Sequence, residues 1–174
     1  GLALQDTLKN MLAGILIILD NRYNVGDFVK INDFTGEVTS LGLQTTKLKS
    51  SSGEVFTISN TNITNVINYS EANTSLYYGI EVSFYRNLVI MEELKKMEEL
   101  EKVLKSLIPK VSKIENVVSE MELLGVDSFN SSSITYKVCI TTKPYKYFNV
   151  KREFNKILKE AFDKSGIEIP YNQL

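Results

Sequence analysis

The first 21 residues place apolar side chains at the period of an α-helix. These positions recur every three or four residues: Leu4, Leu8, Met11, Ile15 and Ile18. The pattern predicts a helix with one apolar stripe. Such a helix is about 30 Å long, which matches a bilayer core, but Asp6 and Lys9 would be costly in lipid. A membrane-associated helix and a buried helix of a soluble domain are both compatible with this segment.

Small residues form a second line along the same predicted helix: Ala3, Thr7, Asn10 and Gly14, with Ala13 beside them. Small side chains at this spacing let two helix backbones approach closely. A glycine inside a helix is about 1 kcal/mol less favourable than alanine unless close packing offsets the difference. Gly14 therefore predicts a close contact at the middle of the helix.

From residue 25 to residue 68 the pattern changes to the period of two that is typical of β-strands. Residues 50–53 read Ser-Ser-Ser-Gly and predict a hairpin loop between two of these strands. Gly42 falls inside a strand pattern, which predicts a bulge or a sharp bend. Four or five short strands of this kind predict a small barrel, bent at Gly42, that rests on a neighbour or on copies of itself.

The polar segment 70–75 interrupts the periodicity and marks a domain boundary. The pattern beyond it predicts six elements: strand 76–84, helix 87–107, strand 117–124, strand 134–142, helix 149–164 and strand 167–169. Pro109 is expected to end the first of these helices, and Gly166 to cap the second in a left-handed conformation. This order is that of a split β-α-β, or ferredoxin-like, fold, so the fold class is α+β.

The composition argues against most kinds of chemistry. The chain has 174 residues, a net charge of −1 and no histidine, which removes the commonest general base and metal ligand. The sequence contains no glycine-rich phosphate loop, and the single cysteine, Cys139, is expected to be a buried thiol. We therefore expect no enzyme activity, no catalytic, cofactor or metal site, and no nucleic-acid partner.

Several short blocks, in their order and spacing, resemble the small-conductance mechanosensitive channel family (MscS). The blocks are Gly1-Leu-Ala-Leu-Gln5, Asn10, Ala13-Gly14, Val25-Gly26-Asp27, Gly36-Glu37-Val38, Gly42-Leu43, Thr45-Thr46, Thr57-Ile58-Ser59-Asn60, Asn68-Tyr69-Ser70 and the tail 166–171. The resemblance covers essentially the whole chain, and most of its specificity lies before residue 70.

This resemblance implies three parts: the end of a pore-lining transmembrane helix over residues 1–22, a small Sm-like bent β-barrel over 23–70, and an α/β cage domain over 71–174. It implies a homo-oligomer, usually a heptamer, in the cell inner membrane, with most of this chain on the cytoplasmic side. Its partners would be copies of itself, the lipid bilayer, and permeating ions and small osmolytes. Membrane tension would open the pore with weak selectivity on hypo-osmotic shock. Because the sequence starts at Gly1 without a methionine, we expect tension-sensing helices before it.

The resemblance also implies roles for particular residues. Leu2 would form the pore constriction. The packing or bending of the pore helix would involve Ala3, Asp6, Thr7, Asn10 and Gly14, and Gly42 would bend the β-domain. Many family members have glycine where this chain has Asp6, so the bend of the helix is left open, as is the closure of the cage base beyond Leu174.

A second reading is a soluble Sm-like ring that binds RNA or another partner, since small bent barrels also build such rings. The slightly acidic net charge and the lack of loops that combine basic and aromatic residues argue against RNA.

Overall fold

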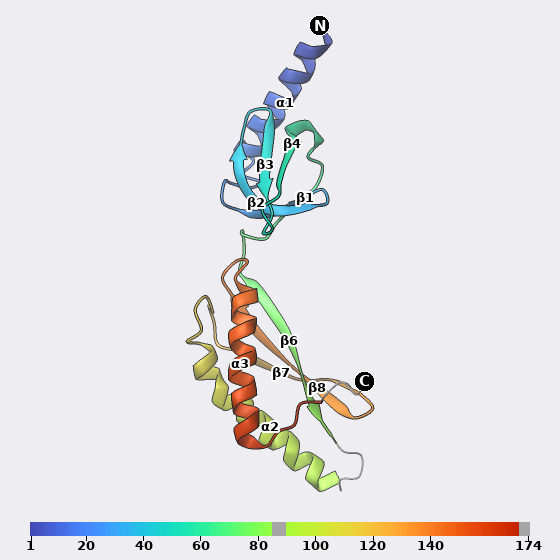
Figure 1. Cartoon of the computed structure of the whole chain (residues 1–174), viewed down its shortest axis with the longest axis vertical. Coiled ribbons are helices and arrows are strands. Elements are labelled where there is room, and N and C mark those ends of the chain that lie inside the picture. The colour runs from blue at the N-terminus through green and yellow to red at the C-terminus, as the bar shows by residue number, and fades with distance from the viewer. Residues whose placement is uncertain (85–89, 171–174) are drawn as a thin grey trace. The chain divides into compact units, whose positions relative to one another are not determined.

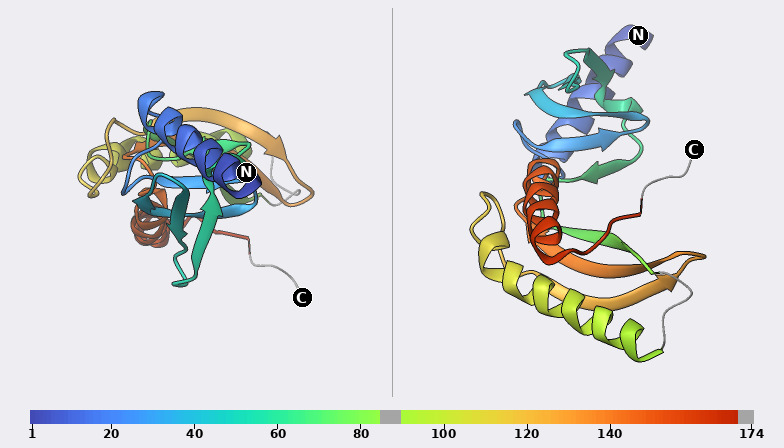
Figure 2. Two further views of the ribbon diagram at one scale, coloured as in Figure 1. Left: turned by 90° about the horizontal axis from the view of Figure 1, so that it is seen from above. Right: turned by 60° about the horizontal axis from the view of Figure 1, so that its bottom comes forward.

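The computed structural model describes residues 1–84 and 90–170 of the chain. It divides into two units, Gly1–Ala72 and Asn73–Leu174, and this division falls within the polar segment 70–75. A helix and a curved sheet make up the first unit, and two long helices with a second sheet make up the other (Figures 1 and 2).

The first unit joins one helix to a five-stranded antiparallel sheet. Its elements are α1 (Leu2–Leu19), β1 (Phe28–Ile31), β2 (Phe34–Leu41), β3 (Thr45–Lys49), β4 (Val55–Ser59), the short 3₁₀ helix η1 (Asn60–Asn62) and β5 (Val66–Asn68). The strands pair in the order β4-β3-β2-β1-β5. The N-terminal half of α1 extends past the strands of this unit (Figure 1).

The core of this unit is small and follows the alternation of its strands. The buried apolar side chains are Ile17, Tyr23, Val29, Ile31, Val38, Leu48 and Ile58. Only Ile17 in this set comes from α1, so the strands supply most of the core. Burial of alternate residues is what the period-two pattern predicted.

The sheet differs in two respects from the predicted barrel. Among the described residues β4 and β5 do not pair with each other, so the curved sheet stays open. The register shifts between Val38 and Ser40, where β2 pairs with β3. Gly42 instead follows β2, and its N–H donates to the carbonyl of Thr45 at 2.8 Å, which closes the turn to β3.

The second unit packs two helices on one face of a three-stranded antiparallel sheet. Its elements are β6 (Thr74–Ser83), α2 (Ile90–Val111), β7 (Glu122–Phe129), β8 (Ser133–Thr142) and α3 (Tyr147–Ser165), with strand order β6-β8-β7. Alternate sheet residues such as Ile80, Val138 and Ile140 join a core with α2 and α3. The α+β fold class predicted from the sequence is confirmed by this arrangement.

The prediction that Pro109 ends the first long helix is wrong. Helix α2 continues to Val111, with Pro109 inside it. A proline in the last turn removes one hydrogen bond, but its fixed φ is compatible with a helix. Val111 and Leu107 are almost fully buried, and we attribute the continuation to this burial. The predicted start of the helix at Asn87 lies outside the described residues.

Two predicted strands also differ from what the structure shows. The strand expected at 117–124 is β7, which starts at Glu122, and Val117 makes only an isolated bridge to Thr142. Gly125, read as its end, lies within β7 at a register shift with φ of 101°. Residues 167–169 do not form a strand; one hydrogen bond, from the N–H of Ser83 to the carbonyl of Glu168 at 3.0 Å, joins this segment to β6.

Candidate functional site

Helix α1 leaves most of its large apolar side chains exposed. Eight of them are between 42% and 81% exposed: Leu2, Leu4, Leu8, Leu12, Ile15, Leu16, Ile18 and Leu19. By contrast, Ile17 is 3% exposed and belongs to the core of the first unit. Adjoining exposed apolar side chains on this scale mark a surface that contacts something other than water.

The backbone of α1 is one continuous helix of 18 residues. It runs through Gln5 and Asp6 without a break, so the structure has no second half-helix that starts at Asp6. None of the helices in the described part of the chain is both long and apolar enough to cross a membrane.

At Gly14 the backbone of α1 lies directly against the turn between β2 and β3 of its own unit. A Cβ atom at this position would lie 2.5 Å from the carbonyl oxygen of Leu43 and 2.5 Å from Nδ2 of Asn60. Both distances are shorter than atomic contact allows, so the turn between β2 and β3 sits directly against the helix backbone. The close contact that the mid-helix glycine predicted therefore exists, and it lies within one chain.

A buried polar network fastens this turn. The side-chain amide of Asn60 donates to the carbonyls of Gly42 at 3.0 Å and Leu43 at 2.9 Å. Its oxygen accepts a hydrogen bond from the hydroxyl of Thr46 at 3.0 Å, and the Tyr23 hydroxyl lies 3.2 Å from the same Thr46 oxygen. Burial raises the pKa of the Tyr23 phenol, so this network is uncharged at neutral pH.

Asn10 makes a second attachment one helical turn before Gly14. Its side-chain oxygen accepts hydrogen bonds from the backbone N–H of Thr61 at 3.1 Å and from the Thr61 hydroxyl at 2.8 Å. Its side-chain nitrogen donates to the backbone carbonyl of Asp6 at 3.1 Å. Asn10 and Gly14, together with buried Ile17, thus define an anchored face of α1 that is held to η1 and to the β2–β3 turn.

The remaining two faces of α1 have different chemistry. Helical geometry turns the chain about 100° per residue, which groups one set of exposed side chains as the apolar face: Leu4, Leu8, Leu12, Ile15 and Leu19. The same geometry places Leu2, Asp6 and Lys9 together on what we call the Asp6 face. The Lys9 ammonium lies 3.9 Å from the Asp6 carboxylate, and both side chains are more than half exposed.

The residues singled out from the sequence lie in two different parts of the first unit. Asn10, Gly14 and the carbonyl of Gly42 meet at the anchor, whereas Leu2 and Asp6 lie on the exposed Asp6 face. Thr7 is half-buried, and the side chain of Ala3 lies outside what the structure describes. Sequence reasoning assigned no role to four anchor residues, Tyr23, Thr46, Asn60 and Thr61, although Thr46 and Asn60 stand in the blocks that carry the resemblance. The mid-helix glycine signalled a contact but could not identify its partner.

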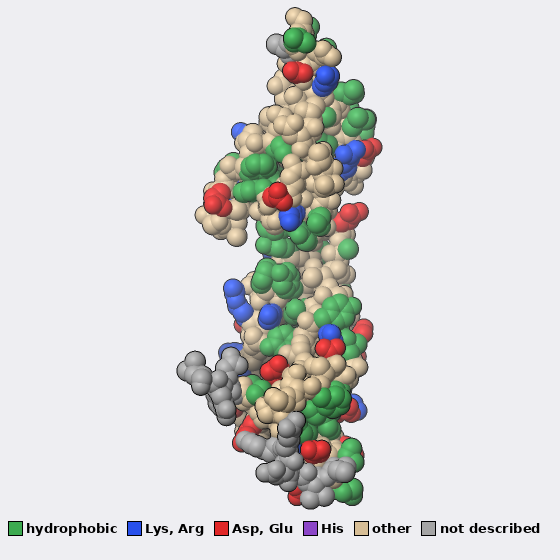
Figure 3. Space-filling model, turned by 90° about the vertical axis from the view of Figure 1, so that its right-hand side faces the viewer, with side chains coloured by type: hydrophobic (Ala, Val, Ile, Leu, Met, Phe, Trp, Pro, Cys, Tyr) green, Lys and Arg blue, Asp and Glu red, His purple; other side chains and the backbone are tan. Residues whose placement is uncertain are grey.

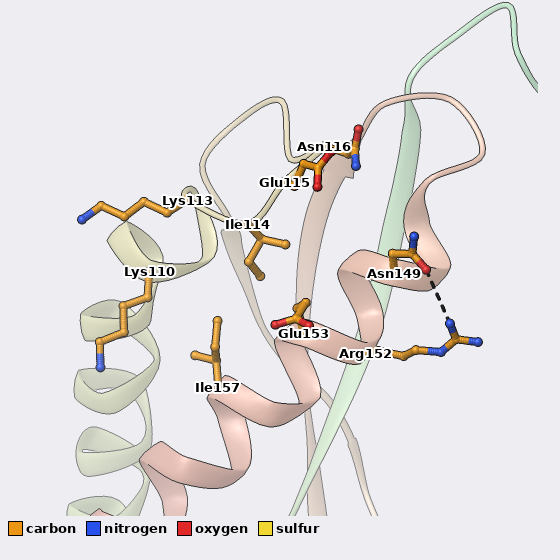
Figure 4. Close-up of a pocket in the computed structure, with 9 residues that line it drawn as sticks. All are labelled: Lys110, Lys113, Ile114, Glu115, Asn116, Asn149, Arg152, Glu153 and Ile157. Carbon is orange, nitrogen blue, oxygen red and sulfur yellow. Dashed lines mark hydrogen bonds between the residues drawn. The ribbon is translucent and has the colours of Figure 1, made fainter.

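One of the grooves of the second unit lies beside the two long helices. It encloses about 650 Å³ between the end of α2, the loop that follows and the start of α3 (Figure 4). Lys110 and Lys113 extend away from Arg152, which donates to Asn149 at 3.4 Å (Figure 4). Basic and acidic side chains are mixed here, and the described residues contain no cluster of three metal-ligating side chains.

Charged side chains are likewise interspersed on the molecular face in Figure 3, where basic and acidic groups alternate with apolar ones. This distribution agrees with a net charge of −1. On this face the basic groups are not gathered into one patch of the kind by which proteins attract nucleic acid.

Two family models match the chain. The model described as "Mechanosensitive ion channel, beta-domain" matches residues 6–71, and "Mechanosensitive ion channel MscS, C-terminal" matches residues 89–169. Both describe parts of ion channels, which favours the first of the two readings of the sequence over the RNA-binding ring.

Curated relatives agree with these matches. The chain is 27% identical to a small-conductance mechanosensitive channel of Caldanaerobacter subterraneus subsp. tengcongensis over 98% of the chain and 58% of the relative. It is 31% identical to an uncharacterized MscS family protein of Aquifex aeolicus over 95% of the chain and 45% of the relative. The chain thus spans about half the length of these relatives.

Solved structures share the fold. The crystal structure of Helicobacter pylori MscS in its closed state superposes with a TM-score of 0.75 at 27% identity, covering 99% of this chain and 66% of that one. The Arabidopsis thaliana MSL1 structure has a TM-score of 0.67 at 16% identity, covering 98% of this chain and 61% of that one, and supports the fold alone.

Proposed function

Because this chain belongs to the MscS family of mechanosensitive ion channels, we propose that it is part of one subunit of a channel that membrane tension opens. Residues 1–22 are then the end of the pore helix, residues 23–70 a β-domain and residues 71–174 a wall of a cytoplasmic cage. Copies of the chain, in a heptamer, surround one axis in the cell inner membrane. The pore is weakly selective and releases ions and small osmolytes on hypo-osmotic shock.

The observation that carries this proposal is the exposed apolar surface of α1 on a helix that is firmly anchored to its own β-domain. Covering one large apolar side chain contributes about 1.5–3 kcal/mol, and eight on α1 are largely exposed. Neighbouring copies or lipid would supply the cover. Lipid around the whole helix is disfavoured, because Asp6 and Lys9 are costly in hydrocarbon. The helix is therefore suited to a border between an apolar surrounding and water.

Leu2 is the residue proposed to close the pore. It is 81% exposed, and it lies on the same side of α1 as the two charged residues, which require water. A ring of leucines at a narrow point blocks ions because an apolar constriction loses its water. Tension favours the conformation with the larger area in the membrane, so it shifts the population towards an open ring.

The anchor links this movement to the β-domain. Gly14 leaves no space between α1 and the β2–β3 turn, and Asn10 holds η1 through two hydrogen bonds. The part of α1 from Asn10 onward therefore moves together with its own β-domain, or the anchor breaks. Leu2 precedes both of these contacts by about two helical turns or more.

The test is the opening tension of the full-length protein in membrane patches. Leu2→Ser should lower the tension needed for opening, because a hydroxyl hydrates the constriction. Leu2→Ile keeps the ring apolar and should change the threshold much less. An unchanged threshold in Leu2→Ser would remove Leu2 from the seal, and the absence of any tension-activated current in the unmodified protein would contradict the proposed function itself.

A further inference from the structure

The position of Asp6 and Lys9 on α1 bears on which ions the pore passes. They follow Leu2 by four and seven residues on a continuous helix, which places both within about 40° of Leu2 around the helix axis. Leu2, Asp6 and Lys9 therefore point to the same side. This side borders the anchored face, since Asn10 follows Asp6 by four residues, and it is turned by about 60° or more from every residue of the apolar face.

Only one of the three faces of α1 is suited to water. The anchored face is filled by the β2–β3 turn and η1, and the apolar face carries leucines and an isoleucine. The Asp6 and Lys9 side chains are 75% and 58% exposed, and the Lys9 ammonium lies 3.9 Å from the Asp6 carboxylate. An exposed pair of this kind is weakly held, so both charges act on their surroundings.

We propose that the Asp6 side chains of all copies form a ring of negative charge just inside the seal, and that this ring makes the open pore prefer cations. Lys9 forms a second ring of positive charge farther from the seal. This inference rests on the proposed function, since it requires copies of α1 around a conducting axis.

The order of the two rings decides the sign of the preference. At about 1.5 Å per residue, Asp6 lies about 6 Å from Leu2 along the helix and Lys9 about 10.5 Å. The field of a charge in water falls with distance and is screened over about 8 Å at physiological salt. The Asp6 ring therefore acts more strongly on an ion at the narrowest point than the Lys9 ring does. The opposing rings keep the preference small.

The experiment is a measurement of reversal potential. The full-length protein is opened by tension in patches between unequal KCl solutions. Asp6→Asn keeps the size of the side chain and removes its charge, and it should lower the permeability ratio of potassium to chloride by about twofold to fivefold. Lys9→Gln should shift the ratio in the opposite direction by a smaller factor.

A carboxylate that lies away from α1 serves as the control for the loss of one negative charge. Asp33 is exposed in the turn between β1 and β2, and Asp33→Asn should leave the ratio unchanged. Tension-activated current in Asp6→Asn with an unchanged ratio, or shifts of the same sign in Asp6→Asn and Lys9→Gln, would overturn the inference and leave the channel proposal standing. A lack of current in the unmodified protein would instead count against the proposed function.

Discussion

Helices α1 and α3 are of similar length but handle their apolar residues in opposite ways. In α3 the apolar residues Val150, Phe154, Leu158 and Phe162 are all buried against the sheet and α2, and charged residues fill the outer side. In α1 the anchored face carries Asn10, Gly14 and one buried apolar residue, Ile17, and the leucines are exposed. Helix α3 therefore buries its apolar side within its own unit, whereas α1 leaves most of its large apolar side chains uncovered in the single chain.

The largest effect expected from this difference is on stability. Phe154→Ala should lower the free energy of unfolding of the second unit by about 3–5 kcal/mol, because it opens a cavity in a filled core. Leu8→Ala, on the apolar face of α1, should change the stability of the isolated chain by less than about 0.5 kcal/mol. Urea unfolding followed by circular dichroism measures both. A comparable loss in Leu8→Ala would mean that the apolar face of α1 is already covered within one chain.

A smaller effect is expected at Gly14, where α1 lies against the turn between β2 and β3. Gly14→Ala would stabilise an exposed helix by about 1 kcal/mol. Here the new Cβ atom meets the Leu43 carbonyl at 2.5 Å, so the substitution should destabilise the first unit by about 1–3 kcal/mol. The informative result is whether Gly14→Ala stabilises or destabilises the first unit. Amide hydrogen exchange of β2 and β3 measures the direction of this change. Slower exchange in the variant would show that the helix does not press on the turn.

The smallest effect concerns the hydrogen bonds of Asn10. Asn10→Ala removes the acceptor of two hydrogen bonds from Thr61, and we expect a loss of about 0.5–1.5 kcal/mol, because water can replace part of the interaction. Asn62→Ala, an exposed asparagine in the same 3₁₀ helix, is the matched control. Equal losses in the two variants, measured by urea unfolding of the chain, would remove Asn10 from the anchor.

The sequence predicted elements well where local signals determine them. The end of α3 follows from Gly166, whose φ of 66° is the left-handed cap that its position indicated. Prediction from the sequence failed where burial outweighed a local signal, since α2 continues through Pro109 to buried Val111. Gly125 reads as a strand end but is a bulge inside β7, and sequence alone does not separate these two uses of glycine.

The anchor shows the same limit at the candidate site. Asn10 and Gly14 stood out in the sequence as residues of close packing, but their partner Asn60 follows Asn10 by 50 residues. No periodicity connects positions so far apart, and the expected contacts were those between neighbouring helices. Packing between copies through Thr7 and Ala3 stays a prediction. The space beside Gly14 is filled by Leu43 and Asn60 of the same chain.

The most direct test of the account is the accessibility of two neighbouring positions on α1 in the proposed channel. In a full-length protein whose cysteines, Cys139 included, are replaced by alanine, Lys9→Cys and Leu8→Cys are each exposed to a charged, membrane-impermeant thiol reagent during tension-activated current. Because Lys9 lies on the Asp6 face and Leu8 on the apolar face, the cysteine at position 9 should react and change the current while that at position 8 does not. Equal reaction at both positions, or reaction at position 8 alone, would contradict the division of α1 into a water-facing side and a covered side.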